Sequence, residues 1–163
     1  MKTKGFSLFE VVVYIAIVSI LMVSVLAIAA ESMSSRVKAV AMQQVNYQSQ
    51  FVMTRLTNDV RAATTIDAAD FSGNVLTVTL ADGTTHQFAV TANQMTLSEN
   101  GGAAVELTSD AVIVSTFTLS DRTTVGSDIH DVSIELTLES ASNNVSPDYA
   151  ASQTLISTAS VRL

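Results

Sequence analysis

The stretch that decides the fold is residues 1–30, MKTKGFSLFEVVVYIAIVSILMVSVLAIAA, in which two lysines and a glycine precede a long apolar run. About 25 residues from Phe6 onward form a predominantly apolar run in which Glu10 is the one charged residue, whereas roughly 18 suffice for a candidate membrane span. As an α-helix, Phe6–Ala30 would measure roughly 37 Å, enough to cross a bilayer core of about 30 Å with some tilt. We therefore expect a single membrane-spanning helix here.

The flanks of this run differ from those of an ordinary secretory signal. Lys2 and Lys4 precede it and Arg36 and Lys38 follow it. The two flanks therefore carry equal numbers of basic residues, and the difference in positive charge that orients membrane helices is close to zero. A secretory signal carries a shorter apolar region that ends in a small-residue cleavage site. Here the small residue, Gly5, comes first. Cleavage after Gly5 would remove the lysines and leave the apolar helix on the mature chain.

Residues 4–10 read K-G-F-S-L-F-E, ahead of the apolar helix. This combination of a basic leader, a glycine, a phenylalanine and a glutamate five residues beyond the cleavage site resembles the N-terminus of type IV pilins and pseudopilins. The resemblance implies that a membrane prepilin peptidase cuts after Gly5 and that the same class of enzyme N-methylates the new terminus at Phe6. It covers about the first 30 residues, so the rest of the chain is interpreted separately.

The presence of Glu10 can be interpreted physically without the resemblance to pilins. A carboxylate inside a spanning helix is costly and is usually functional or paired. The free amine of Phe6 would lie roughly one helical turn away, and in a filament the amine of a new subunit could meet Glu10 of its neighbour. The family is understood to use this glutamate for that step. The alternative is a glutamate near the interface that extends into the lipid headgroups.

Composition narrows the possible functions. The net charge is −7, and an acidic exterior argues against a general nucleic-acid-binding surface. The absence of cysteine excludes disulfides, thiolate metal sites and cysteine nucleophiles. We expect no cofactor, and the exported part must be stabilised by its core, a neighbour or a bound ion. The length suits one modest domain plus an anchor.

The segment 31–63 lacks glycine and proline and is predicted to continue the helix outward. Its apolar residues share one broad face at helical spacing: Ala41, Val45, Val52, Met53, Leu56, Val60 and Ala63. The second half of the helix should therefore pack under a domain, while the first half sits in lipid or against other subunits. A helix of roughly 55 to 60 residues would be about 80 to 90 Å long.

Two features bear on the type of subunit. Many major pilins carry a helix-breaking glycine and proline in the anchor, whereas this chain has Ser19 and Ala27 around those places and only Pro147 elsewhere. A continuous anchor favours a minor pilin or pseudopilin. The helix-closing run from Asp59 to Ala63 resembles J-type minor pseudopilins and W-type minor pilins; the alternative is a solvated charge pair between Asp59 and Arg61.

From Asp67 onward the pattern alternates, which predicts strands. Asp82-Gly83 and Asn100-Gly101 each separate two alternating runs and predict β-hairpins. We expect about seven strands, in one sheet or two: 74–80, 84–90, 93–98, 103–108, 111–119, 131–139 and 154–163. Helix followed by strands indicates an α+β fold, a long N-terminal α-helix packed against an antiparallel β-sheet domain. The expected segments are 1–5 leader, 6–30 transmembrane helix, 31–63 amphipathic continuation and 64–163 exported β domain.

Few side chains outside the anchor are candidates for a site. Asp121, Asp128 and Asp131 cluster near His130, and we predict that they form a solvated acidic loop and no metal site. The alternative is a calcium site, since carboxylates and loop carbonyls can hold calcium, although the spacing does not match an EF-hand. His86 is predicted to point outward from a strand as a surface residue. The remaining expectations are that Phe71, Phe88 and Phe117 belong to the core and that Tyr149 contacts a partner.

No catalytic motif or nucleotide-binding loop was found, so we predict a structural protein and not an enzyme. The prediction is a subunit of a type IV pilus, a competence pseudopilus or a type II secretion pseudopilus. It would reside in the inner membrane with a cytoplasmic N-terminus before assembly, and in a filament afterwards. Its partners would be the lipid bilayer, prepilin peptidase, the inner-membrane assembly platform and other pilin subunits. The alternative is a single-span membrane protein that displays a β domain for adhesion or ligand binding.

Overall fold

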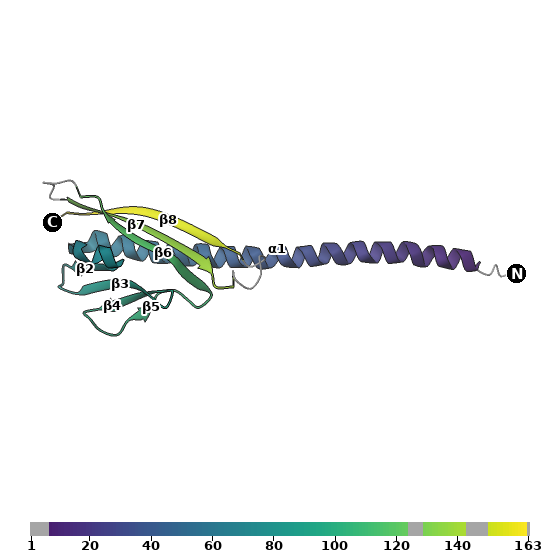
Figure 1. The fold of residues 1–163 in the computed structure, drawn as a ribbon, viewed down its shortest axis with the longest axis horizontal. Coiled ribbons are helices and arrows are strands. Elements are labelled where there is room, and N and C mark those ends of the chain that lie inside the picture. The colour runs from purple at the N-terminus through teal and green to yellow at the C-terminus, as the bar shows by residue number, and fades with distance from the viewer. Residues whose placement is uncertain (1–6, 124–128, 143–149, 163) are drawn as a thin grey trace. The chain divides into compact units, whose positions relative to one another are not determined.

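The computed structural model describes residues 7–123, 129–142 and 150–162, and it divides into two compact units, residues 1–37 and 38–163. One helix, α1 (Leu8–Ala62), contributes to both units (Figure 1). The strands that follow are all antiparallel to their neighbours. A long N-terminal helix followed by antiparallel sheets confirms the predicted α+β class. The helix ends at Ala62, one residue before the predicted boundary.

The strands form two sheets. The first is five-stranded in the order β1-β2-β3-β4-β5, and the second is three-stranded in the order β6-β7-β8. A 3₁₀ helix, η1 (Ala68–Gly73), separates the first two strands. The strand bounds are β1 (Ala63–Asp67), β2 (Leu76–Leu80), β3 (Thr85–Thr91), β4 (Gln94–Glu99), β5 (Val105–Glu106), β6 (Val112–Asp121), β7 (Ile129–Ser140) and β8 (Ser152–Arg162).

Within the described residues, the structure has one strand more than the sequence predicts. β1 (Ala63–Asp67) follows α1 directly, with no glycine or proline between them, and its side chains are mostly exposed. A short polar strand without a turn signal gives no alternating pattern to detect, and it forms because β2 offers an antiparallel partner. The strands also form two sheets, whereas the sequence left open whether they form one sheet or two.

Both predicted hairpins are confirmed, and a third has a different turn. Gly83 at φ 84° and Gly101 at φ 69° adopt left-handed conformations that glycine tolerates best. The Asp82 carboxylate accepts a hydrogen bond from the Thr84 N–H at 2.8 Å. Between β3 and β4, Ala92 and Asn93 form a two-residue turn with φ of 52° and 64°. Two successive positive φ angles are typical of the type I′ turn that suits a hairpin.

The core of the second unit forms where one face of α1 meets both sheets (Figure 1). The predicted apolar face is confirmed: Val45, Val52, Met53, Leu56 and Val60 are buried and Ala41 is partly buried. Ala63 is buried too, as the first residue of β1. Gln48 adds a polar link, because its amide Nε2 donates to Ser109 Oγ and its Oε1 accepts from the Ser109 N–H.

The second sheet shows the period of two that buries one face. Val132, Ile134, Leu136 and Leu138 of β7 are buried, while the residues between them are half-buried. In β6 the buried positions change from even to odd between Val114 and Phe117, where the pairing register shifts. A β-bulge inserts one residue and so changes which side chains face inward. The bulge therefore brings Phe117 into the core.

We predict that Val52→Ala lowers the free energy of unfolding by about 2 kcal/mol, because Val52 is fully buried and its methyl groups would leave a cavity. The measurement is denaturant unfolding of the full chain in detergent micelles, followed by the β-sheet circular dichroism signal. Val40→Ala, on the same helix but 61% exposed, is the matched control and should change stability by less than about 0.5 kcal/mol. Equal effects of the two substitutions would contradict the packing described.

Candidate assembly segment

The first turn of α1 holds the carboxylate that the sequence singled out. The helix begins at Leu8, and the Ser7 carbonyl accepts a hydrogen bond from the Val11 N–H at 3.2 Å. The Glu10 side chain is exposed in this turn, where the partial positive charge of a helix N-terminus favours a carboxylate. The processing residues Gly5 and Phe6 lie outside the described residues.

Tyr14 lies one turn after Glu10 and its hydroxyl donates to Glu10 Oε1 at 3.5 Å. That oxygen–oxygen distance is long for an O–H donor, so this is a weak hydrogen bond. Residues four apart on a helix are neighbours, and this spacing could have identified the pair from the sequence. The Glu10 carboxylate is therefore an exposed acceptor with a weakly held partner, as a group that binds a cation would need to be.

The apolar stretch of α1 in the first unit is not buried by the rest of the protein. Within the described part of the chain, α1 is the one helix long and apolar enough to cross a membrane. Its large side chains from Leu8 to Ile28 are exposed almost throughout. An apolar surface of this extent calls for cover by lipid or by other protein, which fits membrane anchoring.

The serine hydroxyls within this stretch are compatible with an apolar environment. Ser19 Oγ donates to the Ile15 carbonyl at 2.7 Å, and Ser24 Oγ donates to the Ile20 carbonyl at 2.9 Å. A hydroxyl bonded to the preceding turn avoids the cost of entering lipid unpaired. Around Ser19 and Ala27, where many pilins have breakers, α1 is uninterrupted, as the sequence predicted.

In the second unit, the prediction for His86 is wrong. The histidine is buried, and its Nδ1 lies 2.7 Å from Asp59 Oδ2, with the side chains only 8% and 11% exposed. Its Nε2 lies 3.7 Å from Oε1 of the exposed Glu99. Residues two apart in a strand share a face, so His86 faces inward together with Phe88. The face that His86 shares with Phe88 predicts its burial, whereas the polarity of the neighbouring residues does not.

Asp59 also differs from its expected role. The solvated pair with Arg61 is not formed; Arg61 is exposed, whereas Asp59 turns toward β3. Arg55 Nε lies 3.2 Å from the same Asp59 Oδ2. The carboxylate thus joins the last turns of α1 to the first sheet through His86, a role in holding the fold together. The J-type or W-type resemblance of this run gains no support from this geometry.

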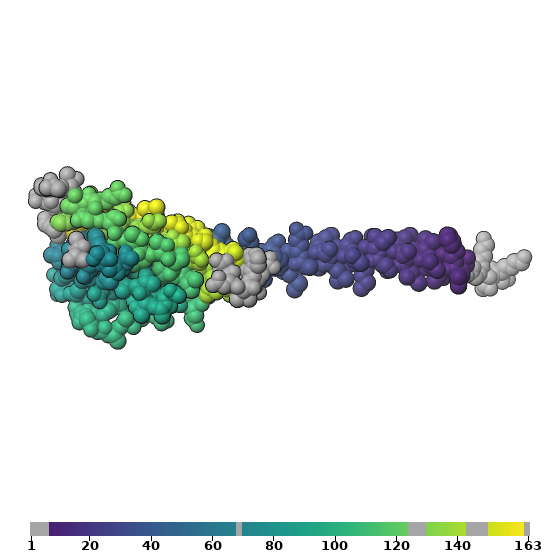
Figure 2. All heavy atoms as spheres, viewed as in Figure 1, coloured from purple at the N-terminus to yellow at the C-terminus, as the bar shows by residue number. Residues whose placement is uncertain are grey.

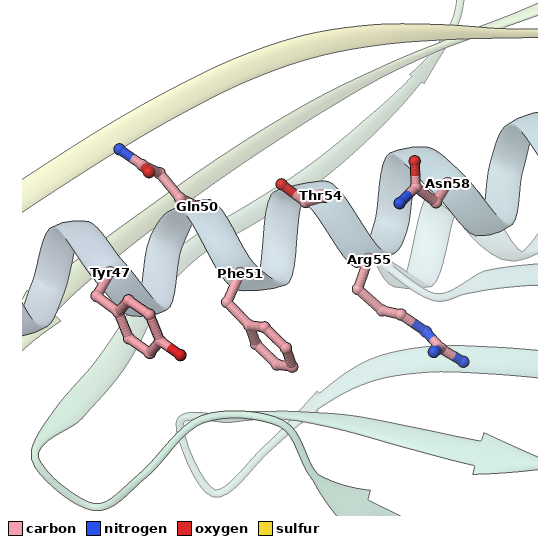
Figure 3. Close-up of a pocket in the computed structure, with 6 residues that line it drawn as sticks. All are labelled: Tyr47, Gln50, Phe51, Thr54, Arg55 and Asn58. Carbon is pink, nitrogen blue, oxygen red and sulfur yellow. The ribbon is translucent and has the colours of Figure 1, made fainter.

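One side of α1 in the second unit is aromatic and exposed. Tyr47 and Phe51 are 72% and 48% exposed, and they project in the same direction as Arg55 (Figure 3). A shallow pocket is lined by these three residues together with Gln50, Thr54 and Asn58. Exposed aromatic side chains are enriched at protein interfaces, so this face is suited to contact another protein.

The acidic loop, for which calcium was the alternative interpretation, is only partly described by the structure. Asp128 lies outside the described residues, and within the described ranges no group of three or more histidine, aspartate and glutamate side chains is placed to hold a metal. Asp121 is exposed and accepts a hydrogen bond from the Thr123 N–H at 2.8 Å. Hydrogen bonds from the Thr123 side chain and N–H lower the pKa of the Asp121 carboxyl, which holds it ionised.

Of the four aromatic residues singled out in the sequence, the structure describes three. Phe71, Phe88 and Phe117 are all buried, which confirms their place in the core. Tyr149, the expected partner contact, lies outside the described residues. The three phenylalanines come from η1, β3 and β6, so they join both sheets to one core.

Comparison with known families matches residues 1–26 to the family described as the prokaryotic N-terminal methylation motif. The match supports the resemblance to type IV pilins and pseudopilins drawn from residues 4–10. No curated protein and no solved structure matches the chain. The interpretation of residues 27–163 therefore rests on the structure.

We predict that Asp59→Ala lowers the free energy of unfolding by about 1–3 kcal/mol, because it leaves the buried His86 ring without its partner. A double-mutant cycle with His86→Ala should show coupling of about 0.5–3 kcal/mol. Asp110→Ala removes an exposed carboxylate and serves as the control, with an expected change below about 0.5 kcal/mol. Additive single effects in the cycle would show that the pair does not stabilise the fold.

Proposed function

We propose that this chain, with its N-terminal methylation motif and long apolar helix, is the precursor of a structural filament subunit. The mature form would be a minor subunit of a type IV pilus or of a related pseudopilus of type II secretion or competence. The observation that carries the proposal is the match at residues 1–26 on a helix whose apolar surface is exposed from Leu8 to Ile28. The uninterrupted α1 supports the minor role.

Processing would create the group that Glu10 needs. Prepilin peptidase would cut after Gly5 and methylate Phe6, which places a new amine four residues from the motif's only carboxylate, Glu10. A carboxylate at membrane depth is costly unless it is paired. In the filament, the amine of an incoming subunit would meet Glu10 of its neighbour and fix the axial register between the two.

Assembly would exchange one apolar environment for another. The subunit would wait in the inner membrane with its β domain exported, residues 6–30 in lipid and residues 31–63 outside. On leaving the bilayer, its apolar side chains would pack against neighbouring helices, so the gain comes from packing and from pairing of Glu10. The exposed Tyr47 and Phe51 would extend this contact into the outer half of the helix. Another protein would supply the work, because this chain has no nucleotide-binding loop.

The first prediction from this proposal concerns the mature N-terminus. Mass spectrometry of the chain from its native cells should find a form that begins at N-methylated Phe6. A Gly5→Val variant should keep Lys2 and Lys4, because a β-branched residue replaces the small residue at the cleavage site. An intact Met1 or cleavage near Ala30 in the unaltered chain would favour the single-span membrane protein with a binding β domain.

The second prediction concerns Glu10. Glu10→Ala should reduce the amount of this chain in purified filaments about tenfold or more, because the incoming amine loses its partner. Glu31→Ala removes another exposed carboxylate from the same helix and should leave incorporation unchanged. Membrane levels and circular dichroism of both variants should match those of the unaltered chain. Normal incorporation of Glu10→Ala would exclude the registration role.

A further inference from the structure

The second unit has four strands at sheet edges, and three of them are poor templates for pairing. β5 is two residues long, and β1 has an irregular register with β2. β6 carries a bulge, and its Val114 N–H donates to the Asn93 carbonyl. Short length, bulges and covering contacts are the usual means by which edge strands avoid association. β8, the remaining edge, is neither short nor bulged, and β1 contacts it without joining its sheet.

β8 (Ser152–Arg162) is long and regular. It pairs with β7 over eleven consecutive positions without a register shift. It contains no proline or glycine, and Arg162 at its end is its one charged residue. Uncharged segments rich in strand-forming residues are prone to pair with another strand when exposed at an edge. Figure 2 shows the yellow atoms of β8 on the surface of this unit.

The hydrogen bonds show which groups of β8 point outward. The Ser140 N–H donates to the Ala151 carbonyl at 2.9 Å, so the backbone N–H and C=O groups of Ala151 point toward β7. Because paired and unpaired positions alternate in an antiparallel ladder, the even-numbered residues of β8 direct their N–H and C=O groups away from β7. Consistent with this, the Thr154 carbonyl accepts a side-chain hydrogen bond from Gln153 at 3.2 Å. The outer edge therefore offers a ladder of backbone donors and acceptors.

The exposed side chains along this edge form a symmetric series. At the even positions 152, 154, 156, 158 and 160 they read Ser, Thr, Ile, Thr and Ser, and all are exposed, Ile156 at 70%. The series is the same in both directions about Ile156. A strand that is symmetric in this way is complementary to an antiparallel copy of itself, as an interface with two-fold symmetry requires.

We propose that β8 pairs with β8 of a second copy of this chain, antiparallel and about a two-fold axis at Ile156. Ile156 then lies opposite its counterpart, and Thr154 lies opposite Thr158 of the partner. Cross-strand threonine pairs and apolar pairs both stabilise a sheet, and the two three-stranded sheets become one of six strands. β1 contacts β8 but belongs to the other sheet, and the exposed residues around Ile156 form the centre of the proposed interface.

The two-fold axis limits where this contact can form. It reverses the direction of the partner's β8, so the paired copies have opposite orientations. Subunits of one filament share a single orientation, and the contact therefore joins copies in different filaments or outside any filament. The inference does not depend on the proposed function, because it rests on the backbone pairing and the side chains of β8 alone.

The test uses disulfide trapping, which is clean because the chain contains no cysteine. Opposed residues of a hydrogen-bonded antiparallel pair have Cα atoms about 5.5 Å apart, a separation that a disulfide spans. The full chain is prepared as Ile156→Cys in excess detergent micelles, oxidised with copper phenanthroline and analysed on a non-reducing gel. Thr154→Cys is the matched control, because its two copies would lie four residues out of register.

We expect Ile156→Cys to give about tenfold more disulfide-linked dimer than Thr154→Cys, since only the former brings two thiols within bonding distance. The double variant Thr154→Cys/Thr158→Cys should crosslink at least as well as Ile156→Cys and tests the same register without altering Ile156. Association through the apolar helices would act on every variant alike. Absence of dimer in both Ile156→Cys and the double variant, or equal crosslinking at positions 154 and 156, would overturn the proposal.

Discussion

The structure of the second unit depends on the burial of one face of α1 beneath two separate sheets. Both sheets are small, with five strands in the first and three in the second. Neither of them encloses a core by itself. Side chains such as Val52 and Leu56 fill the space between them and are fully buried. Small sheets need an apolar partner to be stable, and here the helix is that partner for both. The burial of this face is therefore what makes residues 38–163 a compact unit.

The same helix meets a different requirement in its first half. From Leu8 to Ile28 its apolar side chains are exposed, and its serine hydroxyls are bonded within the helix. One continuous element thus combines a face that is satisfied by its own domain with a segment that needs lipid or other helices. This division is what a subunit requires if it is stored in a membrane and later assembled, because the second half holds the domain together in either setting.

Polar contacts decide how the helix end is attached. Asp59 and His86 are 27 residues apart in sequence, yet their side-chain atoms approach to 2.7 Å. Gln48 and Ser109, 61 residues apart, form a second such link. The sequence analysis identified neither link: His86 was placed on the surface, and for Asp59 only a solvated charge pair was considered as the alternative to a family resemblance. Partners distant in sequence carry no local signal, so only the folded chain identifies them.

The sequence by itself determined the elements whose cause is local. Continuous hydropathy specified the first half of the helix, and apolar residues at helical spacing specified its second half. Glycines specified two hairpins, and residues 4–10 specified the N-terminal methylation motif with Glu10. Tertiary structure decided what depends on contacts between distant segments: the separation into two sheets, the polar strand β1, the β6 bulge that buries Phe117 and the inward orientation of His86. The turn at Ala92-Asn93 belongs to the second group as well. Asn93 tolerates positive φ, but Ala92 adopts it too, because the pairing of β3 with β4 stabilises a conformation that alanine does not favour alone.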